Sequence, residues 1–293
     1  MKSEPMILDG RKVAGDIQAE IKTEVENLKQ QGFKVPHLAA ILVGDDGASQ
    51  TYVKNKIKAC KNVGFEYSLL QYPESITEAK LLAAVDRINE DEDVDGLIVQ
   101  LPLPDHISGV KVIEHISSSK DVDGFTNENY GAITSKRPGI MPATPFGIQE
   151  LLKRYKIQIK GKHCVIVGNS RTVGAPMSSI MSFHENATVT ICHIYTEDLA
   201  SFTRLADILI VATGKPGLIK ADMIKEGAVV VDVGISRIEA DNERGYVLKG
   251  DVEFEEVKPK ASYITPVPGG VGPMTIASLL LNTLKASRQR HQS

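Results

Sequence analysis

The strongest constraint on the fold is a regular alternation of short apolar runs with helical patterns in the second half of the chain. The run at residues 164–167 (Cys-Val-Ile-Val) ends at Gly168 and leads into a helical pattern over 175–183. Further apolar runs follow at residues 187–192, 207–212 and 228–233. Strands that alternate with helices form a mostly parallel sheet, because parallel neighbours need a crossover connection. The pattern therefore predicts an α/β fold with a Rossmann-like parallel sheet in this half.

The first half of the chain shows the same alternation and predicts a second α/β domain. A helical pattern over 17–28 precedes an apolar run at 38–43, and a polar helix over 49–62 precedes another apolar run at 96–100. The pattern restarts near residues 142–145, and a length of 293 residues suits two domains. The last helical pattern, over 273–286, follows the last strand. It could pack back on the first domain, which would make that domain discontinuous.

Composition and charge exclude several classes of function. A net charge of −3 gives no electrostatic basis for binding nucleic acid or an anionic membrane. No apolar run reaches the roughly 18 residues of a spanning helix, and the first ten residues lack the apolar core of a secretory signal. The three cysteines, Cys60, Cys164 and Cys192, are an odd number without metal-ligand spacing. We therefore expect a cytoplasmic protein.

A segment dense in proline and glycine, residues 266–275, precedes the last helical pattern. It holds three prolines and three glycines, and Pro273 suits the first turn of the helix that follows. Proline fixes φ, and glycine permits positive φ and close approach, so this composition predicts a rigid loop that delivers a helix N-terminus. An ordinary tight connector is the alternative, although loops of this kind are often placed for binding.

The turn that follows residues 164–167 is a candidate phosphate-binding turn. Its spacing is not G-x-G-x-x-G, so a turn without a ligand stays the alternative. A strand that feeds a glycine turn and then a helix can still offer backbone N–H groups to a phosphate. No carboxylate stands at the end of the next strand, around His193, where a ribose-binding residue is expected. Its absence permits a 2′-phosphate, for which Arg171 could supply the counter-charge, and so favours NADP over NAD.

Three polar features in the first half could carry chemistry. Tyr52 and Lys56 are four residues apart on one predicted helix, where a tyrosine ring can stack on a flat heterocycle and a lysine can donate or act as a base. Gln100 ends a buried strand, at the sheet edge where ligands bind. Asp121 and Asp123 share a loop and could cap a helix, bind a metal or pair with an amino-substituted ring. For each feature a purely structural role is the alternative.

Six motifs, taken together and in order, resemble the bifunctional methylenetetrahydrofolate dehydrogenase/cyclohydrolase family (the FolD type). They lie at residues 52–56, 100–104, 120–124, 142–145, 231–235 and 266–275. The resemblance implies two α/β domains flanking a cleft. Residues 1–145 plus 273–293 would form a folate-binding catalytic domain, and residues 146–272 an NAD(P)-binding Rossmann-like domain. It also implies a homodimer built through the second domain, no metal, and a role in one-carbon metabolism and purine biosynthesis.

The activity that the resemblance implies has two steps. Methylenetetrahydrofolate passes a hydride to NADP, and the resulting methenyltetrahydrofolate is hydrolysed to formyltetrahydrofolate. By this resemblance Lys56 is the central catalytic group, Gln100 holds it, Tyr52 stacks on the folate and Asp123 anchors the pterin. The expected substrate-binding residues are Tyr52, Ser49, Gln100, Leu101, Asp123, Pro268, Gly269 and Gly270. The expected cofactor-binding residues are Gly168, Asn169, Ser170, Arg171, Ile235 and Thr275.

The chemistry of the methenyl group agrees with this role for Lys56. The group is a cation, which a protonated amine would repel. A neutral Lys56 could accept a proton from the attacking water, and we expect burial to lower its pKa. The chain departs from many relatives at two positions near the adenosine ribose, with Asn169 in place of arginine and Ile194 in place of serine. We expect NADP as the cofactor, with NAD possible.

Three other functions compete with this interpretation. A non-catalytic dinucleotide-binding regulator would keep the glycine turn and lose the chemistry, yet Tyr52, Lys56, Gln100 and Asp123 are all present. A dehydrogenase for another substrate, of the shikimate or amino-acid type, would lack both the 52–56 helix and the 266–275 loop. A single-function member of the same family stays an alternative.

Overall fold

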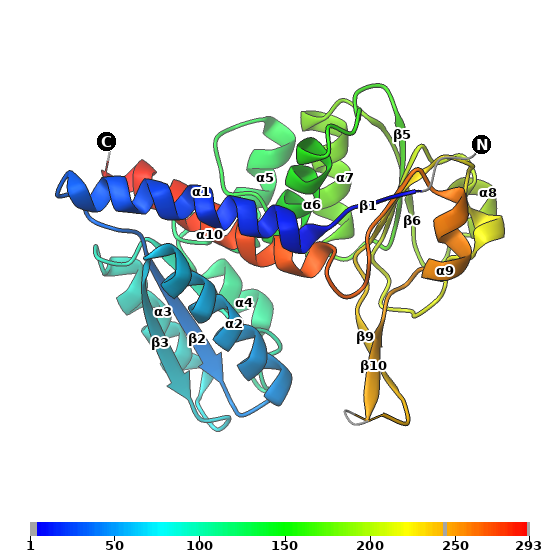
Figure 1. Cartoon of the computed structure of the whole chain (residues 1–293). Coiled ribbons are helices and arrows are strands. Elements are labelled where there is room, and N and C mark those ends of the chain that lie inside the picture. Colours follow the sequence, from blue (N-terminus) through cyan, green and yellow to red (C-terminus); the bar gives the residue numbers. More distant parts are fainter. Residues whose placement is uncertain (1–4, 243–244, 292–293) are drawn as a thin grey trace. The chain divides into compact units, whose positions relative to one another are not determined.

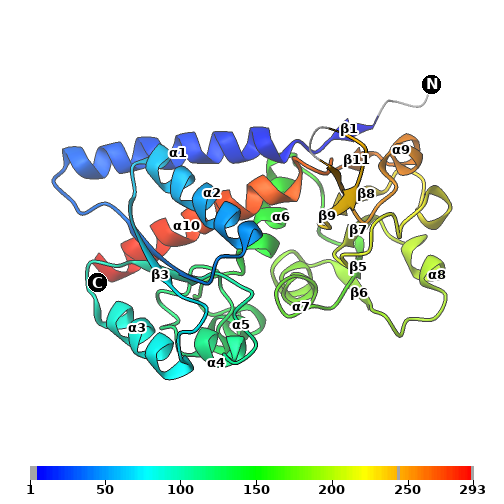
Figure 2. The same ribbon diagram turned by 90° about the horizontal axis from the view of Figure 1, so that it is seen from below.

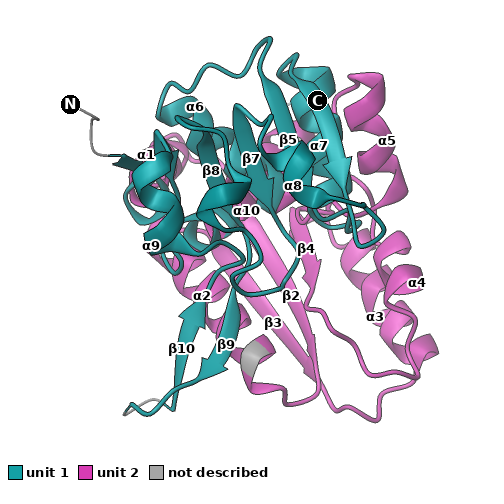
Figure 3. Cartoon of the chain, turned by 90° about the vertical axis from the view of Figure 1, so that its right-hand side faces the viewer, with its two compact units in different colours: residues 1–14, 144–275 teal, residues 15–143, 276–293 magenta. Residues whose placement is uncertain are grey.

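The computed structural model describes residues 5–242 and 245–291 (Figure 1). The chain forms two compact units (Figure 3). Unit 1 comprises residues 1–14 and 144–275, and unit 2 comprises residues 15–143 and 276–293. Two long helices, α1 (Gly10–Gln30) and α10 (Val271–His291), each begin in unit 1 and end in unit 2.

Unit 1 is built on a parallel sheet of six strands in the order β1-β11-β8-β7-β5-β6. The strands are β1 (Met6–Ile7), β5 (His163–Val167), β6 (Thr188–Cys192), β7 (Ile208–Val211), β8 (Val229–Asp232) and β11 (Tyr263–Ile264). Strands β7 and β8 are buried along their whole length, because the unit covers both faces of the sheet. The predicted α/β fold class, with a Rossmann-like parallel sheet, is confirmed.

Short helices and one hairpin complete unit 1. The helical elements are α6 (Ala143–Arg154), α7 (Gly174–Ser179), a π-helical turn (Ile180–His184), α8 (Leu199–Thr203), α9 (Phe254–Val257), and 3₁₀ turns at Ala221–Met223 and Lys258–Lys260. Strands β9 (Ser236–Glu239) and β10 (Tyr246–Lys249) pair as an antiparallel hairpin that projects from the sheet (Figure 1). The helix expected over 175–183 is therefore α-helical only in its first part.

Unit 2 holds a parallel sheet of three strands in the order β3-β2-β4. The strands are β2 (His37–Val43), β3 (Glu66–Tyr72) and β4 (Gly96–Val99), and the helices between and after them are α2 (Gly47–Val63), α3 (Glu78–Glu90), α4 (Gly109–Glu114) and α5 (Asn127–Ser135). Side chains cap the helix starts: Asp46 accepts from the backbone of α2, and Thr77 does the same for α3. These caps fix where α2, the helix of Lys56, begins.

Residues 5–14 lie in unit 1. Strand β1 pairs with β11, so these residues group with the six-stranded sheet, whereas the sequence analysis placed them with the other domain. A strand of two residues carries no periodicity, and its partner is far away in the sequence. Within residues 5–242 and 245–291, no helix combines the length and the apolar character that crossing a bilayer requires.

Candidate functional site

Strand β5 lies where the connections of the unit 1 sheet change direction. From β5 the chain continues to β6 on one side, while β7 and β8 lie on the other (Figure 2). In open α/β sheets, ligands bind outside the carboxyl ends of the strands at such a switch point. The segments after β5 and β7, which begin at Gly168 and Ala212, therefore line the candidate ligand site of unit 1.

Gly168 has a backbone conformation that favours glycine. Its φ is +111°, and a Cβ there would lie 2.1 Å from the carbonyl oxygen of Ala212. The segments after β5 and β7 thus touch at this residue. Residues 169–171 are exposed, and the hydroxyl of Ser170 accepts a hydrogen bond from the backbone N–H of Val173 at 3.2 Å. The turn offers exposed polar groups at the switch point, which fits a dinucleotide phosphate.

Two further predicted cofactor residues also lie in unit 1. Ile235 is 48% exposed and follows the carboxyl end of β8, so it lies at the same sheet edge as Gly168. Thr275 lies near the start of α10, and its hydroxyl is 3.0 Å from that of Thr144. The sheet edge therefore gathers Gly168 and Ile235, whereas helix α10 sets the position of Thr275.

The loop of residues 266–275 packs against the start of α1. The backbone N–H of Arg11 donates to the carbonyl of Gly269 at 3.0 Å. A Cβ on Gly10 would lie 1.7 Å from the carbonyl oxygen of Gly270, so only glycine permits this approach. Gly269 has φ +114°, and the peptide bond before Pro268 is cis. The loop has the defined path that its composition predicts.

In unit 2 the amine of Lys56 lies between two predicted partners. The residue comes from α2 and is 8% exposed. Its Nζ donates to Oε1 of Gln100 at 3.4 Å and lies 3.8 Å from Oδ2 of Asp123. The amide of Gln100 donates to the carbonyl of Leu101 at 2.7 Å, which orients its oxygen towards the amine. Residues from three distant segments thus meet around one amine.

Two other predicted residues come from the same helix. Tyr52 is 48% exposed, one turn before Lys56. Ser49 is 4% exposed in the first turn, where its backbone N–H donates to the capping carboxylate of Asp46 at 2.7 Å. The exposed ring of Tyr52 is free to receive a flat ligand, whereas Ser49 is largely covered by the protein.

The structure separates the two aspartates of the 121–124 loop. Asp121 is 1% exposed and accepts three hydrogen bonds at 2.7 to 3.1 Å, two from backbone N–H groups and one from the amide of Asn129. It therefore stabilises the turn. Burial raises the pKa of Asp123, and the charge of Lys56 opposes that rise. No cluster of three or more His, Cys, Asp or Glu side chains suited to a metal occurs among the described residues.

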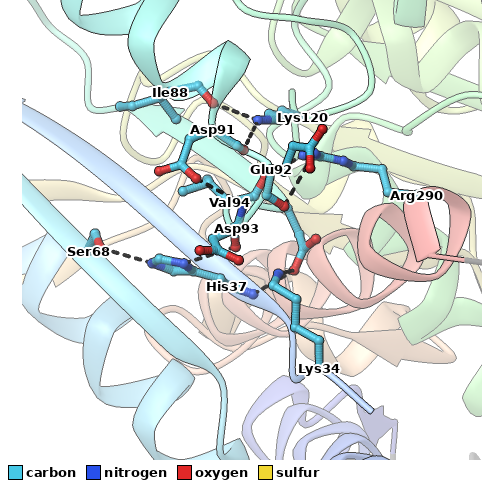
Figure 4. Close-up of polar contacts among 11 residues, drawn as sticks. Lys34, His37, Ser68, Ile88, Asp91, Glu92, Asp93, Val94, Lys120 and Arg290 are labelled. Atoms are coloured by element: carbon cyan, nitrogen blue, oxygen red, sulfur yellow. Dashed lines mark hydrogen bonds and ion pairs between the residues drawn. The ribbon is translucent and has the colours of Figure 1, made fainter.

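Lys120 anchors the segment that carries Asp123 (Figure 4). It is 2% exposed, and its Nζ donates to the carbonyl oxygens of Ile88 and Asp91, both at 2.6 Å. Burial lowers the pKa of Lys120 to about 8, and the charge of Arg290 acts in the same direction. Because Ile88 and Asp91 lie at the end of α3, the loop is tied to that helix.

Sequence reasoning missed two buried carboxylates of unit 1. Asp232 and Asp251 are 3% and 0% exposed, and Asp251 binds the segment after β7. Its partners there are 37 and 38 residues away in the sequence, so no local pattern points to them. The neighbouring glycines, Gly234 and Gly250, are the local signal that could have indicated a close approach.

A parallel sheet with a glycine turn at its switch point, in a chain whose second α/β unit buries a lysine, is the architecture of a two-domain dinucleotide-dependent enzyme. Comparison with protein families makes the assignment specific. The model of the tetrahydrofolate dehydrogenase/cyclohydrolase catalytic domain matches residues 8–123, and that of the NAD(P)-binding domain matches residues 142–291. The chain belongs to the tetrahydrofolate dehydrogenase/cyclohydrolase family.

Full-length relatives agree with this assignment. The bifunctional protein FolD of Cytophaga hutchinsonii is 57% identical over 96% of this chain and 98% of its own length. The crystal structure of FolD from Campylobacter jejuni, a methylenetetrahydrofolate dehydrogenase/cyclohydrolase, has a TM-score of 0.93 at 49% identity and covers 97% of this chain and 99% of its own. The Trypanosoma brucei enzyme, complexed with NADP and an inhibitor, has a TM-score of 0.94 at 38% identity, with 99% and 100% covered. The predicted family is confirmed.

Proposed function

We propose that this chain catalyses two consecutive steps on tetrahydrofolate. It oxidises methylenetetrahydrofolate to methenyltetrahydrofolate with NADP, and it hydrolyses that product to formyltetrahydrofolate. The observation that carries the proposal is the nearly buried amine of Lys56, in reach of both Gln100 and Asp123. Membership of the family and the FolD relatives at more than 50% identity support the same pair of activities, which belong to one-carbon metabolism.

The oxidation step requires alignment of the folate's methylene carbon with the nicotinamide and does not require a protein nucleophile. A nicotinamide cofactor held by the residues after β5 would supply the acceptor for the hydride that leaves the methylene carbon. The protein has to hold the folate in the orientation that permits this departure. Tyr52 is suited to stack on the folate ring because its own ring is exposed, and Asp123 is suited to pair with the amino-substituted pterin. The remaining proposed substrate-binding residues are Ser49, Gln100, Leu101, Pro268, Gly269 and Gly270.

The hydrolytic step requires a group that takes a proton from water. Water adds to the methenyl carbon, which carries a positive charge, and the ring then opens to the formyl product. In this proposal Lys56 acts in its neutral form as the base, since an ammonium would repel the cation. The oxygen of Gln100 accepts a hydrogen bond from the amine and so fixes its direction.

The cofactor is held by unit 1 in this proposal. The proposed contact residues are Gly168, Asn169, Ser170, Arg171, Ile235 and Thr275. Residues 169–171 are exposed beside the switch point, and Arg171 supplies a positive charge for a 2′-phosphate. NADP is therefore the proposed cofactor, in line with the Trypanosoma brucei relative complexed with NADP. A much higher kcat/KM with NAD than with NADP in steady-state kinetics would overturn this preference.

We propose a folate-binding domain of residues 1–145 plus 273–293 and a cofactor-binding domain of residues 146–272. The compact units, whose boundaries fall near residues 143–144 and 275–276, support this division except at the start of the chain. We further propose a homodimer that forms through β6. This strand ends the sheet order, and apolar side chains on and after it are exposed, among them Ile191 at 38%, Ile194 at 89% and Tyr195 at 82%. The three free and buried cysteines support a cytoplasmic location.

Substitution of Lys56 by methionine tests the function. Absorbance of the methenyl product is followed in two assays, its formation from methylenetetrahydrofolate with NADP and its decay by hydrolysis. We expect Lys56→Met to lower the hydrolysis rate by a factor on the order of 10² to 10⁴, the range typical of a lost general base. Lys54→Met, the same change at an exposed position of the same helix, should leave both rates near those of the unaltered chain. Unchanged hydrolysis in Lys56→Met would reject the role of this lysine.

A further inference from the structure

Two buried carboxylates connect three segments at the carboxyl edge of the unit 1 sheet. Asp232, the last residue of β8, accepts hydrogen bonds from the backbone N–H groups of Asp251 at 3.0 Å and Val252 at 2.9 Å. Asp251 in turn accepts three hydrogen bonds on its Oδ2: from the N–H and hydroxyl of Thr213 at 2.6 and 2.9 Å, and from the N–H of Gly214 at 3.0 Å. The end of β8 therefore holds Asp251, and Asp251 holds the loop after β7.

Close packing against glycine fixes both carboxylates. A Cβ on Gly234 would lie 2.1 Å from Oδ1 of Asp251, and a Cβ on Gly250 would lie 2.0 Å from Oδ2 of Asp232. Oδ1 of Asp251 is buried and has no hydrogen-bond partner among the described residues. A buried polar atom without a partner is destabilising. The three hydrogen bonds that Oδ2 accepts are therefore the interactions that require an aspartate at this position.

The loop that Asp251 holds lies at the switch point of the sheet. It follows β7 directly, and the carbonyl of Ala212, the residue before it, touches the Cα side of Gly168 in the candidate phosphate-binding turn. Gly214 has φ +68°, so the loop turns sharply at this point. The segments after β5 and β7 are the two that face a ligand bound at such a point. The position of the 213–214 loop therefore bears directly on the ligand of unit 1.

We propose that Asp251 is a positioning residue for cofactor binding, which it serves by holding the 213–214 loop against the NADP site. This inference rests on the proposed function, because it takes the ligand at this edge to be NADP. Asp251 is itself fully buried and acts only through the loop. Loss of its carboxylate should therefore weaken NADP binding, while hydrolysis of methenyltetrahydrofolate, which consumes no NADP, should persist.

The experiment compares Asp251→Ala with the unaltered chain in three measurements. Calorimetric titration with NADP gives the dissociation constant, steady-state oxidation gives KM and kcat, and hydrolysis of added methenyltetrahydrofolate reports the other activity. We expect the dissociation constant and the KM for NADP to rise about tenfold, the effect of losing roughly one net hydrogen bond's free energy. The hydrolysis rate should stay within about a factor of two, since Asp251 hydrogen-bonds to Thr213, Gly214 and Asp232, none of which is a proposed folate-binding residue. Asp251→Asn, which keeps an acceptor oxygen for the three donors, should recover most of the affinity.

Two further variants keep the test decisive. Thr213→Val removes one of the three hydrogen bonds and should raise the dissociation constant for NADP by a smaller factor, so it carries the test if Asp251→Ala does not fold. Asp95→Asn is the matched control, because Asp95 is a fully buried aspartate of unit 2 that accepts the backbone N–H of His37 at 2.9 Å. It should lower thermal stability without changing NADP affinity.

The outcomes separate this inference from the proposed function. Unchanged NADP affinity in folded Asp251→Ala and in Thr213→Val overturns the inference, as does an equal fall of both activities with unchanged affinity. An unaltered chain that neither oxidises methylenetetrahydrofolate nor hydrolyses the methenyl product overturns the proposed function instead, and calorimetry with NADP still tests the role of Asp251.

Discussion

Replacing Lys120 by methionine should destabilise the protein although the side chain lies outside the proposed chemistry. Methionine matches the length of the lysine stem, so the change removes mainly the ammonium. The lost interactions are the two hydrogen bonds at 2.6 Å to the carbonyls of Ile88 and Asp91. Hydrogen bonds from charged donors contribute about 1.5 to 3 kcal/mol each, and burying the ammonium offsets part of that sum. Each carbonyl also keeps a backbone donor, from Asp91 at 3.3 Å and from Val94 at 3.2 Å. We therefore expect a loss of about 2 kcal/mol, near the cost of one charged hydrogen bond.

The assay is urea unfolding followed by far-ultraviolet circular dichroism. With a slope of about 2 kcal/mol per molar urea, the transition midpoint should fall by about 1 M. Lys80→Met, an exposed position on the same helix α3, is the control and should shift the midpoint little. A midpoint in Lys120→Met equal to that of the control would refute the role of these hydrogen bonds.

The difference in stability between the unaltered chain and Lys120→Met should also depend on pH. The pKa of Lys120 is lowered from 10.5 to about 8 in the folded protein, so between these values the folded chain has released a proton that the unfolded chain still binds. Stability contributed by this group therefore rises with pH across that window and is at its lowest below pH 8. The unaltered chain should gain stability relative to Lys120→Met from pH 8 towards 10.5. A difference that stays constant or shrinks would contradict burial as the cause of the shift.

Two further predictions follow from unit 1. Gly234→Ala places a Cβ 2.1 Å from the carboxylate of Asp251, so it should raise the KM for NADP while sparing methenyltetrahydrofolate hydrolysis, and equal loss of both rates would argue against this. Ile194→Asp should raise the dissociation constant of the proposed dimer at least about 100-fold, because burial of each of the two isoleucines contributes about 1.5 to 3 kcal/mol. Analytical ultracentrifugation measures this constant, and an unchanged dimer would exclude Ile194 from the interface.

The regular parts of the fold could be predicted from the sequence because their apolar patterns are local. The runs over 164–167 and 207–212 became buried parallel strands within a residue of their expected ends. Strand β3 was missed because its residues alternate between exposed and half-covered along a sheet edge and include polar side chains. Strands β1 and β11 hold two residues each and exist through pairing alone. Pairing between distant segments leaves no trace in a local window.

The same contrast between local patterns and distant contacts applies to the candidate site. The shared face of Tyr52 and Lys56 follows from helical spacing, but the meeting of Lys56 with Gln100 and Asp123 was expected only through the family resemblance. Asp251 was missed because its hydrogen bonds span 37 and 38 residues and it lies in a loop. Helical spacing reports neighbours on one element, whereas a carboxylate that joins two loops is defined by the sheet that brings them together.

The division of the chain into units has a consequence for synthesis on the ribosome. Residues 276–291 complete unit 2, and they are made only after residues 144–275, whereas the other residues of unit 2, 15–143, are made before them. Strand β1 likewise cannot join the sheet until β11, the strand with which it pairs, has been made. During translation unit 2 lacks residues 276–291 of α10, so the apolar surface that this helix would cover stays accessible while residues 144–275 emerge. Deleting the last turns of α10 should therefore lower the yield of native protein, while the molecules that do fold keep the rates of both reactions.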